Sequence, residues 1–422
     1  MKNRILKAFL IALLISPAFF LQAQAQEQEE DSLLRVIEKL QSDVSILSKI
    51  KISGYVQAQF QMTDSAGITS IAGGNFDKGI DKRFSVRRGR LKVAYNTALS
   101  QYVLQFDATE SGMSVKDIYF KTTDPYLGAF SLTAGIFNRP FGYEIEYSSS
   151  QRESPERSMV FQTLFPGERD LGASLTIQPP KTSNYNFIKL DLGVFNGTGP
   201  KAKDFDNRKD FIGHLTLNKS YLQETLRVGL GASYYNGRVI NGTKKVWSMS
   251  DNIFKVDSAA GNTSAYSERI FKGLEAQFAY ISPLGLSQLR GEYLWGKQSG
   301  SSSSSKTPEV KPAGDTYVRD FAGYYIMFTQ NIMQSKHQLV LKYDVYDPNT
   351  AVSGNEIGAS GSGTKAGDIE YSTFGFGWVY RFDSNLKLTA YYDVVTNEKT
   401  NISGYTKDLK DNVFTLRLQY KF

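Results

Sequence analysis

The last twelve residues of the chain, 411–422, alternate between apolar and polar side chains. One face of this segment would carry Phe414, Leu416, Leu418, Tyr420 and Phe422, and the other Thr415, Arg417, Gln419 and Lys421. A period of two predicts a β-strand rather than a helix. A chain that stops on an aromatic residue after such a strand is typical of an outer-membrane β-barrel. A half-buried strand of a secreted sandwich is the alternative interpretation.

The same alternation recurs from residue 51 onward and predicts sixteen short strands. They are 51–60, 84–95, 101–107, 115–122, 131–137, 171–178, 187–195, 210–217, 225–235, 267–281, 287–297, 317–330, 337–346, 369–382, 386–396 and 412–422. Short connections such as 96–100, 282–286 and 383–385 alternate with long ones such as 61–83, 138–170, 236–266, 298–316 and 347–368. Short periplasmic turns and long outer loops produce this rhythm, so we expect every short connection to be a periplasmic turn.

Within the predicted strands, apolar residues alternate with charged ones. Ile188, Leu190, Leu192 and Val194 oppose Lys189 and Asp191, and Leu339, Leu341, Tyr343 and Val345 oppose Lys342 and Asp344. We expect one face to meet lipid and the other to meet water, because charges in a packed core would be very costly. Sixteen strands form a cylinder wide enough for an aqueous channel. The sequence therefore predicts an all-β fold, an antiparallel transmembrane barrel with a wet lumen.

The N-terminal segment reads as a secretory signal peptide. Lys2, Arg4 and Lys7 precede the apolar run 8–21, and small residues stand at the cleavage positions in 23–25. We therefore predict a signal peptide over residues 1–25. A transmembrane anchor is the alternative, but the run is short, and the chain contains no other apolar run of about 18 residues. The mature chain is expected to contain no membrane helix.

A helical segment is predicted between the signal peptide and the first strand, over residues 26–50. Leu33, Ile37, Leu40, Val44 and Leu47 follow the alternating four- and three-residue steps of a heptad seam. This segment is either a short periplasmic coiled coil that helps subunits associate or an amphipathic helix packed under the barrel. The sequence thus divides into the signal peptide 1–25, the helical segment 26–50 and the barrel 51–422.

Composition agrees with an exported barrel and excludes several functions. The chain has 25 Tyr and 27 Phe, a mean hydropathy of −0.33 and no Cys, so disulfides and thiolate metal sites are absent. Without Lys2, Arg4 and Lys7 the formal charge falls from +7 to +4. The chain shows no block of Lys and Arg of the kind that follows nucleic-acid phosphates. We therefore expect no nucleic-acid partner.

Enzyme chemistry has little support in the sequence. The two histidines, His214 and His337, fall on different predicted strands, and neither has a serine nucleophile motif beside it. No carboxylate spacing suggests a metal-binding loop. We expect no catalytic residue, no cofactor and no metal.

Several motifs together resemble the phosphate-selective porins O and P. They are Phe84-Ser-Val-Arg-Arg-Gly-Arg-Leu91, Gly135-Ile-Phe-Asn-Arg-Pro-Phe-Gly142, Glu156-Arg-Ser158, Pro166-Gly-Glu-Arg-Asp-Leu-Gly172, Val194-Phe-Asn-Gly197 and Lys342-Tyr-Asp-Val-Tyr-Asp-Pro-Asn349. The resemblance covers about residues 50–422. It implies a homotrimer of sixteen-stranded anion channels in which the third outer loop, here 138–170, folds inward to constrict the pore. It also implies an anion-guiding basic pair, Arg87 and Arg88, followed by Arg90 and Lys92.

The expected constriction nevertheless contains both charge signs. Its loop carries six acids, Glu144, Glu146, Glu153, Glu156, Glu168 and Asp170, against four bases, Arg139, Arg152, Arg157 and Arg169. The expected pore-lining residues are thus Arg87, Arg88, Arg90, Lys92, Arg139, Arg152, Arg157 and Arg169. Arginine forks suit phosphate oxygens. A lumen of balanced charge is instead typical of a general porin, so we expect a modest anion preference.

These observations predict an outer-membrane porin that lets small hydrophilic solutes diffuse passively, with inorganic phosphate or other anions as preferred solutes. Its partners would be outer-membrane lipid, these solutes and two further copies of the chain. The alternative is a surface adhesin or recognition barrel that acts through its long outer loops. Ion conductance discriminates between them, because an adhesin barrel need not pass ions.

Overall fold

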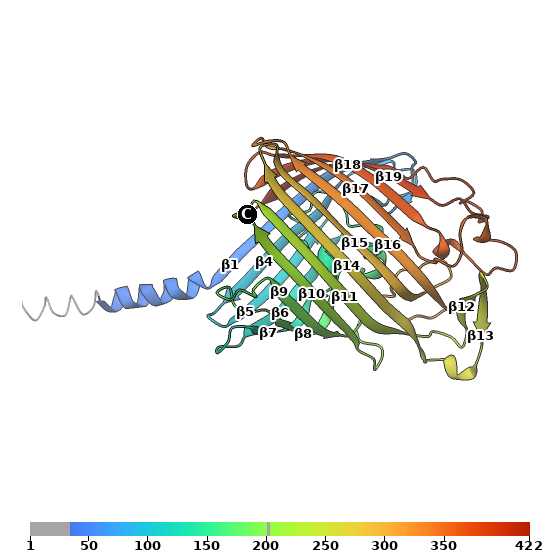
Figure 1. Cartoon of the computed structure of the whole chain (residues 1–422), viewed down its shortest axis with the longest axis horizontal. Helices are drawn as coiled ribbons and strands as arrows, with labels where there is room; N and C mark the ends of the chain where they lie inside the picture. Colours follow the sequence, from blue (N-terminus) through green and yellow to red (C-terminus); the bar gives the residue numbers. More distant parts are fainter. Residues whose placement is uncertain (1–33, 201–202) are drawn as a thin grey trace, which may run out of the picture.

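The computed structural model describes residues 34–200 and 203–422. Its main sheet has eighteen strands, of which sixteen close into an antiparallel barrel through the pairing of β1 with β20 (Figure 1). The barrel strands are β1 (Ile50–Thr63), β4 (Lys82–Asn96), β5 (Ser100–Thr109), β6 (Gly112–Thr123), β7 (Phe130–Asn138), β8 (Arg169–Ile177), β9 (Ile188–Phe195), β10 (Asp210–Tyr221), β11 (Leu226–Ile240), β14 (Tyr266–Ser282), β15 (Gly285–Gly300), β16 (Thr316–Asn331), β17 (His337–Asp347), β18 (Tyr371–Arg381), β19 (Leu386–Asn397) and β20 (Val413–Lys421). The predicted number, order and approximate positions of the sixteen strands are confirmed.

The alternating pattern places apolar side chains outside the barrel and polar ones inside. In β20, Leu416 and Leu418 are exposed on the outer surface, whereas Thr415, Arg417 and Gln419 are buried in the interior. Residues paired across neighbouring strands point to the same side of the barrel, as Gln57 of β1 and its partner Gln419 both point inward. The outer surface is therefore an apolar band suited to lipid, as expected for a transmembrane barrel.

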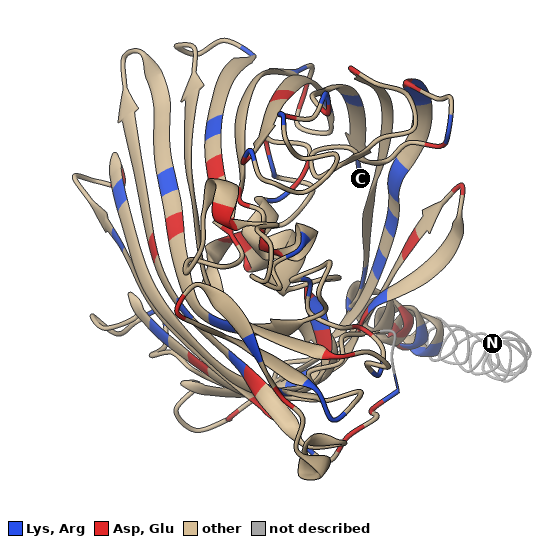
Figure 2. Ribbon diagram, turned by 90° about the vertical axis from the view of Figure 1, so that its right-hand side faces the viewer, with Lys and Arg blue, Asp and Glu red and all other residues tan. Residues whose placement is uncertain are grey.

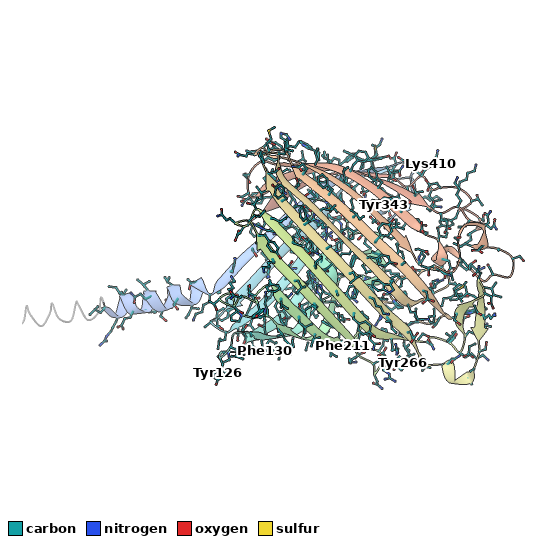
Figure 3. All side chains as sticks on the ribbon, viewed as in Figure 1. Tyr126, Phe130, Phe211, Tyr266, Tyr343 and Lys410 are labelled. Atoms are coloured by element: carbon teal, nitrogen blue, oxygen red, sulfur yellow. The ribbon has the colours of Figure 1, made fainter. Side chains whose placement is uncertain are left out.

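Aromatic side chains occur on this outer surface near both ends of the barrel. Figure 3 shows Tyr126 and Phe130 near one end, and Phe211 and Tyr266 towards the other. Tyr126 is 93% exposed, which would be unfavourable in water but suits the interface between lipid and water.

Both described ends of the chain lie at one end of the barrel, here called the terminus end (Figure 1). The long connections lie at the opposite loop end: 64–81, 139–168, 196–209, 241–265, 301–315, 348–370 and 398–412. The expectation that every short connection is a terminus-end turn is wrong at one place. Only Glu110 and Ser111 join β5 to β6 at the loop end, in a tight hairpin closed by Gly112 with φ +118°.

Two small hairpins lie in the connections at the loop end. β2 (Thr69–Ser70) pairs with β3 (Gly74–Asn75) in the connection 64–81. β12 (Val246–Ser250) pairs with β13 (Ile253–Asp257). β12 also pairs in parallel with the start of β16. Three single turns of 3-10 helix, η1 (Ala260–Asn262), η2 (Gly354–Glu356) and η3 (Ala366–Asp368), complete these loops.

A helix over residues 34–48 precedes β1 and extends away from the barrel (Figure 1). All its residues are exposed, including the seam residues Ile37, Leu40, Val44 and Leu47, while Leu33 and the predicted signal peptide lie outside the described residues. Helical structure is therefore present where it was predicted, but the helix does not pack under the barrel. Within residues 34–200 and 203–422, no helix is long and apolar enough to cross a membrane.

The connection between β7 and β8, residues 139–168 and here called L3, folds into the barrel interior (Figure 2). It contains two short helices, α2 (Gly142–Glu146) and α3 (Met159–Leu164). Its apolar side chains, Phe141, Ile145, Val160, Phe161, Leu164 and Phe165, pack against inward-facing apolar residues of the wall such as Tyr235, Phe271, Phe321 and Tyr325.

The expectation of a wholly wet lumen is therefore wrong on one side. From β10 round to β19, several inward-facing positions are apolar, and L3 covers them in a dry core. The strand pattern suggested only water on the inner face because it does not reveal which residues a loop will cover. A polar cavity lies on the other side of L3, next to the wall formed by β1 and β4–β6.

Candidate functional site

A cavity of about 410 Å³ lies between L3 and the polar wall, and it is here called the main cavity because most of the predicted pore-lining bases surround it. Seven bases and six acids line it. The bases are Arg87, Arg88, Arg90, Lys116, Arg157, Arg169 and Lys306, and the acids are Asp107, Asp117, Glu146, Glu156, Glu168 and Glu309. Figure 2 shows both charge signs on the strands and on the interior loops. The cavity is therefore strongly polar but close to neutral.

A β-bulge in β4 turns two successive arginines towards the interior. Gln57 of β1 pairs with Arg88, but the next residue, Ala58, pairs with Val86, so Arg87 is an additional residue in the ladder. In a regular strand, Arg87 would face lipid, because Arg88 faces the lumen. The bulge removes this conflict and allows both guanidinium groups to line the cavity.

A second bulge in β6 has the same effect on Lys116. Gln105 of β5 pairs with Asp117, whereas Phe106 pairs with Val115, so Lys116 is the additional residue. Lys116 and Asp117 therefore both line the cavity. Lys116 was not among the predicted pore-lining residues, because strict alternation gives an outward position to a residue next to inward Asp117.

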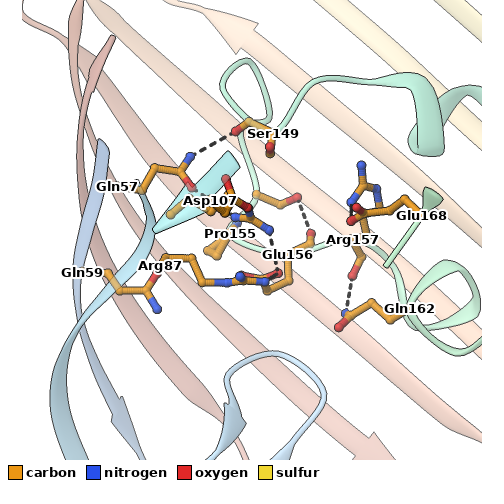
Figure 4. A network of polar contacts seen from close by, with 12 residues as sticks. Gln57, Gln59, Arg87, Asp107, Ser149, Pro155, Glu156, Arg157, Gln162 and Glu168 are labelled. Atoms are coloured by element: carbon orange, nitrogen blue, oxygen red, sulfur yellow. Dashed lines mark hydrogen bonds and ion pairs between the residues drawn. The ribbon is translucent and has the colours of Figure 1, made fainter. Parts of the chain in front are cut away.

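Acidic groups neutralise the arginines of the wall. Arg87 donates from Nε and Nη2 to the two carboxylate oxygens of Glu156, each at 2.7 Å (Figure 4). Arg90 makes the same two-pronged contact with Asp107 at 2.6 Å. Arg88 donates to Gln57 Oε1 at 3.1 Å and lies 3.7 Å from Glu156. Paired guanidinium groups create transverse fields rather than a purely positive lining.

Glu168 joins the end of L3 to the start of β8. Its carboxylate contacts Arg157, and its Oε2 lies 2.9 Å from Arg169 Nη1, while Arg169 Nε donates to Asp117 at 2.5 Å. Gly167 and Glu168 both have left-handed backbone, with φ of +70° and +63°, which costs a non-glycine residue about 1 kcal/mol or more. Burial favours neutral Glu168, but Arg157 and Arg169 outweigh burial and hold its pKa well below the usual range.

Three of the expected pore-lining bases do not line the main cavity. Lys92 follows Arg90 in β4 but lies beyond the cavity. Arg139 is 1% exposed, donates to the carbonyl oxygens of Pro166 and Glu168, and lies 4.9 Å from the Phe165 ring, so it supports the base of L3.

Arg152 is also buried, within L3. Among the described residues, none of its three guanidinium nitrogens has a hydrogen-bond partner. Burial lowers the pKa of Arg152 to about 10, and the nearby Arg157 adds to this effect. The remaining five expected bases, Arg87, Arg88, Arg90, Arg157 and Arg169, line the main cavity.

Hydrogen bonds fix the tip of L3 to the opposite wall. Tyr55 Oη lies 2.5 Å from Ser149 Oγ, and Gln57 donates to the Ser149 carbonyl at 3.1 Å. Lys387 and Gln419 both donate to the carbonyl oxygen of Ser150, at 3.0 and 2.9 Å. L3 therefore spans the lumen and is held on both sides.

Further cavities continue the main cavity towards both ends of the barrel. A loop-end cavity of about 360 Å³ shares Arg87, Glu156 and Gln162 with it. A terminus-end cavity of about 500 Å³ shares Tyr147 with it and reaches the turn at Asp383. The three polar cavities therefore follow one another from the loop end to the terminus end, and Tyr147 lies between the main cavity and the terminus-end cavity.

Comparisons with known proteins agree on the architecture. No protein-family model matches the sequence, and no curated protein matches it. Among solved structures, the anion-selective porin from Comamonas acidovorans is similar with a TM-score of 0.52 at 11% identity, over 88% of this chain and 99% of that one. The outer-membrane channel DcaP of Acinetobacter baumannii gives 0.51 at 12% identity, over 88% and 97%. OmpF of Salmonella typhi, in complex with daunomycin, also gives 0.51 at 12%, over 88% and 97%.

At identities this low, the structural similarity establishes the fold alone. The chain is a closed sixteen-stranded antiparallel barrel with a helix-bearing loop folded into its lumen, and its fold is similar to that of these outer-membrane proteins.

Proposed function

We propose that this protein is a passive porin of the bacterial outer membrane that lets small hydrophilic solutes cross. The observation that carries this proposal is the set of three polar cavities beside L3. Two lie between L3 and the wall of β1 and β4–β6, and the third lies between L3 and β15–β20 at the terminus end. A recognition scaffold has no need of such a series, whereas a diffusion pore requires one. L3 sets the narrowest part, because its polar contacts hold it across the lumen.

We further propose a modest anion preference, with inorganic phosphate among the solutes. The resemblance to phosphate-selective porins O and P and the additional base supplied by Lys116 both support it. Asp107, Glu156 and Glu168 reduce the preference, because they occupy the guanidinium forks that a phosphate would use. The pore is therefore expected to favour anions without excluding cations.

Neutralising the basic wall tests the anion preference. A variant with Arg87, Arg88, Arg90 and Lys92 all changed to Gln should shift the reversal potential in a potassium chloride gradient towards cation selectivity. An unchanged potential would contradict the proposed role. Two single variants sharpen the test: Lys116→Gln should shift the potential in the same direction, whereas Lys92→Gln, outside the main cavity, should change it little.

No described feature favours an enzyme over a channel, and the chain is proposed to perform no chemistry. The second candidate function, an adhesin or recognition barrel, rests on the long connections at the loop end. Single-channel recording separates it from a porin. Stepwise conductance supports the porin, and an intact barrel that never conducts supports the adhesin.

We propose that three copies assemble in the membrane. The exposed heptad seam of the helix 34–48 offers one contact as a periplasmic coiled coil. A lipid-facing apolar groove of about 510 Å³, whose lining includes Tyr95, Tyr102, Ala134 and Gly135, offers another. Native mass spectrometry should find a trimer, and deletion of residues 26–48 should weaken it. A monomer in the intact chain would contradict the assembly.

Export is proposed to remove residues 1–25. The basic start, the apolar run and the small residues at 23–25 carry this proposal. The mature protein purified from outer membranes should then begin at Gln26, as N-terminal sequencing would establish. Retention of Met1 would support the anchor instead.

A further inference from the structure

A second polar cluster lies where α2 of L3 meets the barrel wall. One nitrogen or oxygen atom from each of Glu146, Asp191 and His214 lies within 4.8 Å of the other two. Glu146 ends α2, whereas Asp191 of β9 and His214 of β10 are direct partners across the strand ladder. His214 Nδ1 lies 3.6 Å from Glu146 Oε1, and its Nε2 lies 3.3 Å from Glu275 Oε2. Side chains from L3, β9, β10 and β14 therefore meet at one point.

The buried imidazole at this point lacks hydrogen bonds. His214 is 1% exposed, and neither ring nitrogen has a hydrogen-bond partner among the described residues. The same is true of Glu275 Oε2. The outer oxygens of the cluster are satisfied: Thr176 donates to Asp191 Oδ1 at 2.5 Å, and Gln277 donates to Glu275 Oε1 at 3.4 Å. Buried polar atoms normally form hydrogen bonds, so an imidazole that lies 3.3 to 3.6 Å from two carboxylates without a hydrogen bond to either requires an explanation.

The charge of the cluster suits a divalent cation. It contains three carboxylates, those of Glu146, Asp191 and Glu275, and one ammonium group, that of Lys189. With neutral His214, two negative charges remain uncompensated. Lys189 Nζ lies 2.8 Å from Asp191 Oδ2 and 3.5 Å from Glu146 Oε2, so it competes for the oxygens that a metal would use. Its flexible stem allows it to move aside.

We propose that Glu146, Asp191 and His214 bind a divalent transition-metal ion, with Zn²⁺ as the best fit. An imidazole nitrogen with two carboxylate oxygens is a donor set of this class, and three protein ligands leave one position for water. Metal binding through His214 Nδ1 leaves Nε2–H to donate to Glu275. A carboxylate is a usual acceptor for the second ring nitrogen of a metal-bound histidine. The ion enters from the lumen, because Glu146 lines the main cavity and its side chain is 37% exposed.

Metal binding would have two consequences for L3. It would join the end of α2 to β9 and β10, and it would place positive charge beside the main cavity. The second consequence rests on the proposed channel function, whereas the binding itself does not. Binding and conductance are therefore measured separately.

Isothermal titration calorimetry of the refolded barrel with Zn²⁺ tests the site. One equivalent should bind, and His214→Gln or Glu146→Gln should weaken binding by about 10- to 100-fold. The other histidine provides a matched control: His337 in β17 accepts a hydrogen bond from Trp378 at 3.0 Å, and His337→Gln should bind Zn²⁺ like the original chain. Lys189→Met should tighten binding, because it removes the competing ammonium group.

Co²⁺ provides a spectroscopic readout that a purely structural role for His214 would not produce. A visible absorption band should appear with the original chain and with His337→Gln, and it should be absent with His214→Gln. No Zn²⁺ binding by the original chain, or equal binding by the folded His214→Gln variant, would overturn the proposal. A barrel that binds Zn²⁺ but never conducts would refute the channel and leave the metal site intact.

Discussion

Arg87 and Glu156 form a two-pronged ion pair, with both N–O distances at 2.7 Å, that joins the bulge of β4 to the middle of L3. Glu156 also lies 3.2 Å from Arg417 of β20, so one carboxylate links L3 to two strands of the wall. This contact fixes both the position of L3 and the charge balance of the main cavity.

Glu156→Gln should make the pore more anion-selective. The change removes a negative charge from the main cavity and leaves Arg87, Arg88 and Arg417 less compensated. A unit charge about 4 Å away contributes about 1 kcal/mol in water, so the chloride-to-potassium permeability ratio should rise by up to about five-fold. Reversal potentials in a salt gradient measure this ratio.

The matched control for this variant is Glu224→Gln. Glu224 lies in a terminus-end turn, where its side chain is 77% exposed and 3.8 Å from Arg227. Removing its charge should leave the permeability ratio almost unchanged. Equal shifts in both variants would mean that overall charge, rather than the main cavity, sets selectivity.

Deleting Arg87 should preserve the barrel and remove the link to L3. Without the additional residue, Val86 and Arg88 become direct neighbours and β4 pairs regularly with β1. Deletion of Val86 gives a chain of equal length but places Arg87 on the lipid face, at a cost of about 2–4 kcal/mol near the middle of the bilayer. Heat-dependent migration on gels should therefore show efficient folding for the first deletion and weaker folding for the second. The reverse order would contradict the bulge.

Phe161→Ala should loosen L3. Phe161 is 1% exposed, and its ring centre lies 6.0 Å from that of Phe165 and 6.3 Å from that of Tyr325. Truncating a buried phenylalanine typically costs roughly 3–5 kcal/mol, so residues 139–168 should become more accessible to protease and channel recordings noisier. Phe84→Ala serves as the control, because Phe84 is 83% exposed on the lipid face. Unchanged protection of L3 in Phe161→Ala would refute the dry core.

The attachment of L3 should withstand mild acid. Burial favours neutral Glu156, but Arg87 and Arg88 outweigh burial and hold its pKa well below the usual range. A carboxyl whose pKa is lowered by folding contributes stability above its unfolded pKa, and this contribution is lost as pH falls through the folded value. Hydrogen exchange of residues 139–168 should therefore change little between pH 7 and 5, and protection should be lost only well below about 4.3. Loss of protection at pH 5 would contradict the ion pair.

The sequence predicted the barrel well because alternation is a local property. The inward Thr415 and Arg417 and the outward Leu416 and Leu418 could be assigned from their spacing alone. The bulges could not, because nothing in the residues around Arg87 and Lys116 distinguishes an additional residue from a regular one. The dry side of the lumen was also missed, because inward Tyr235 and Phe271 acquire their cover from Phe165, far away in the sequence.

The cluster around His214 illustrates the same limit. Glu146, Asp191, His214 and Glu275 come from four separate segments, and no sequence spacing relates them. Their meeting depends on the inward course of L3 and on the ladder register of β9 and β10. The family resemblance suggested that L3 folds inward, but only the structure places Glu146, at the end of α2, beside the His214 imidazole.

The most direct test of the account is single-channel recording of the purified, refolded protein in planar bilayers, with a potassium chloride gradient across the membrane. We predict stepwise conductance with a reversal potential displaced modestly to the anion side. A folded barrel that produces no conductance steps would contradict the proposal that the polar cavities beside L3 form a path through the barrel.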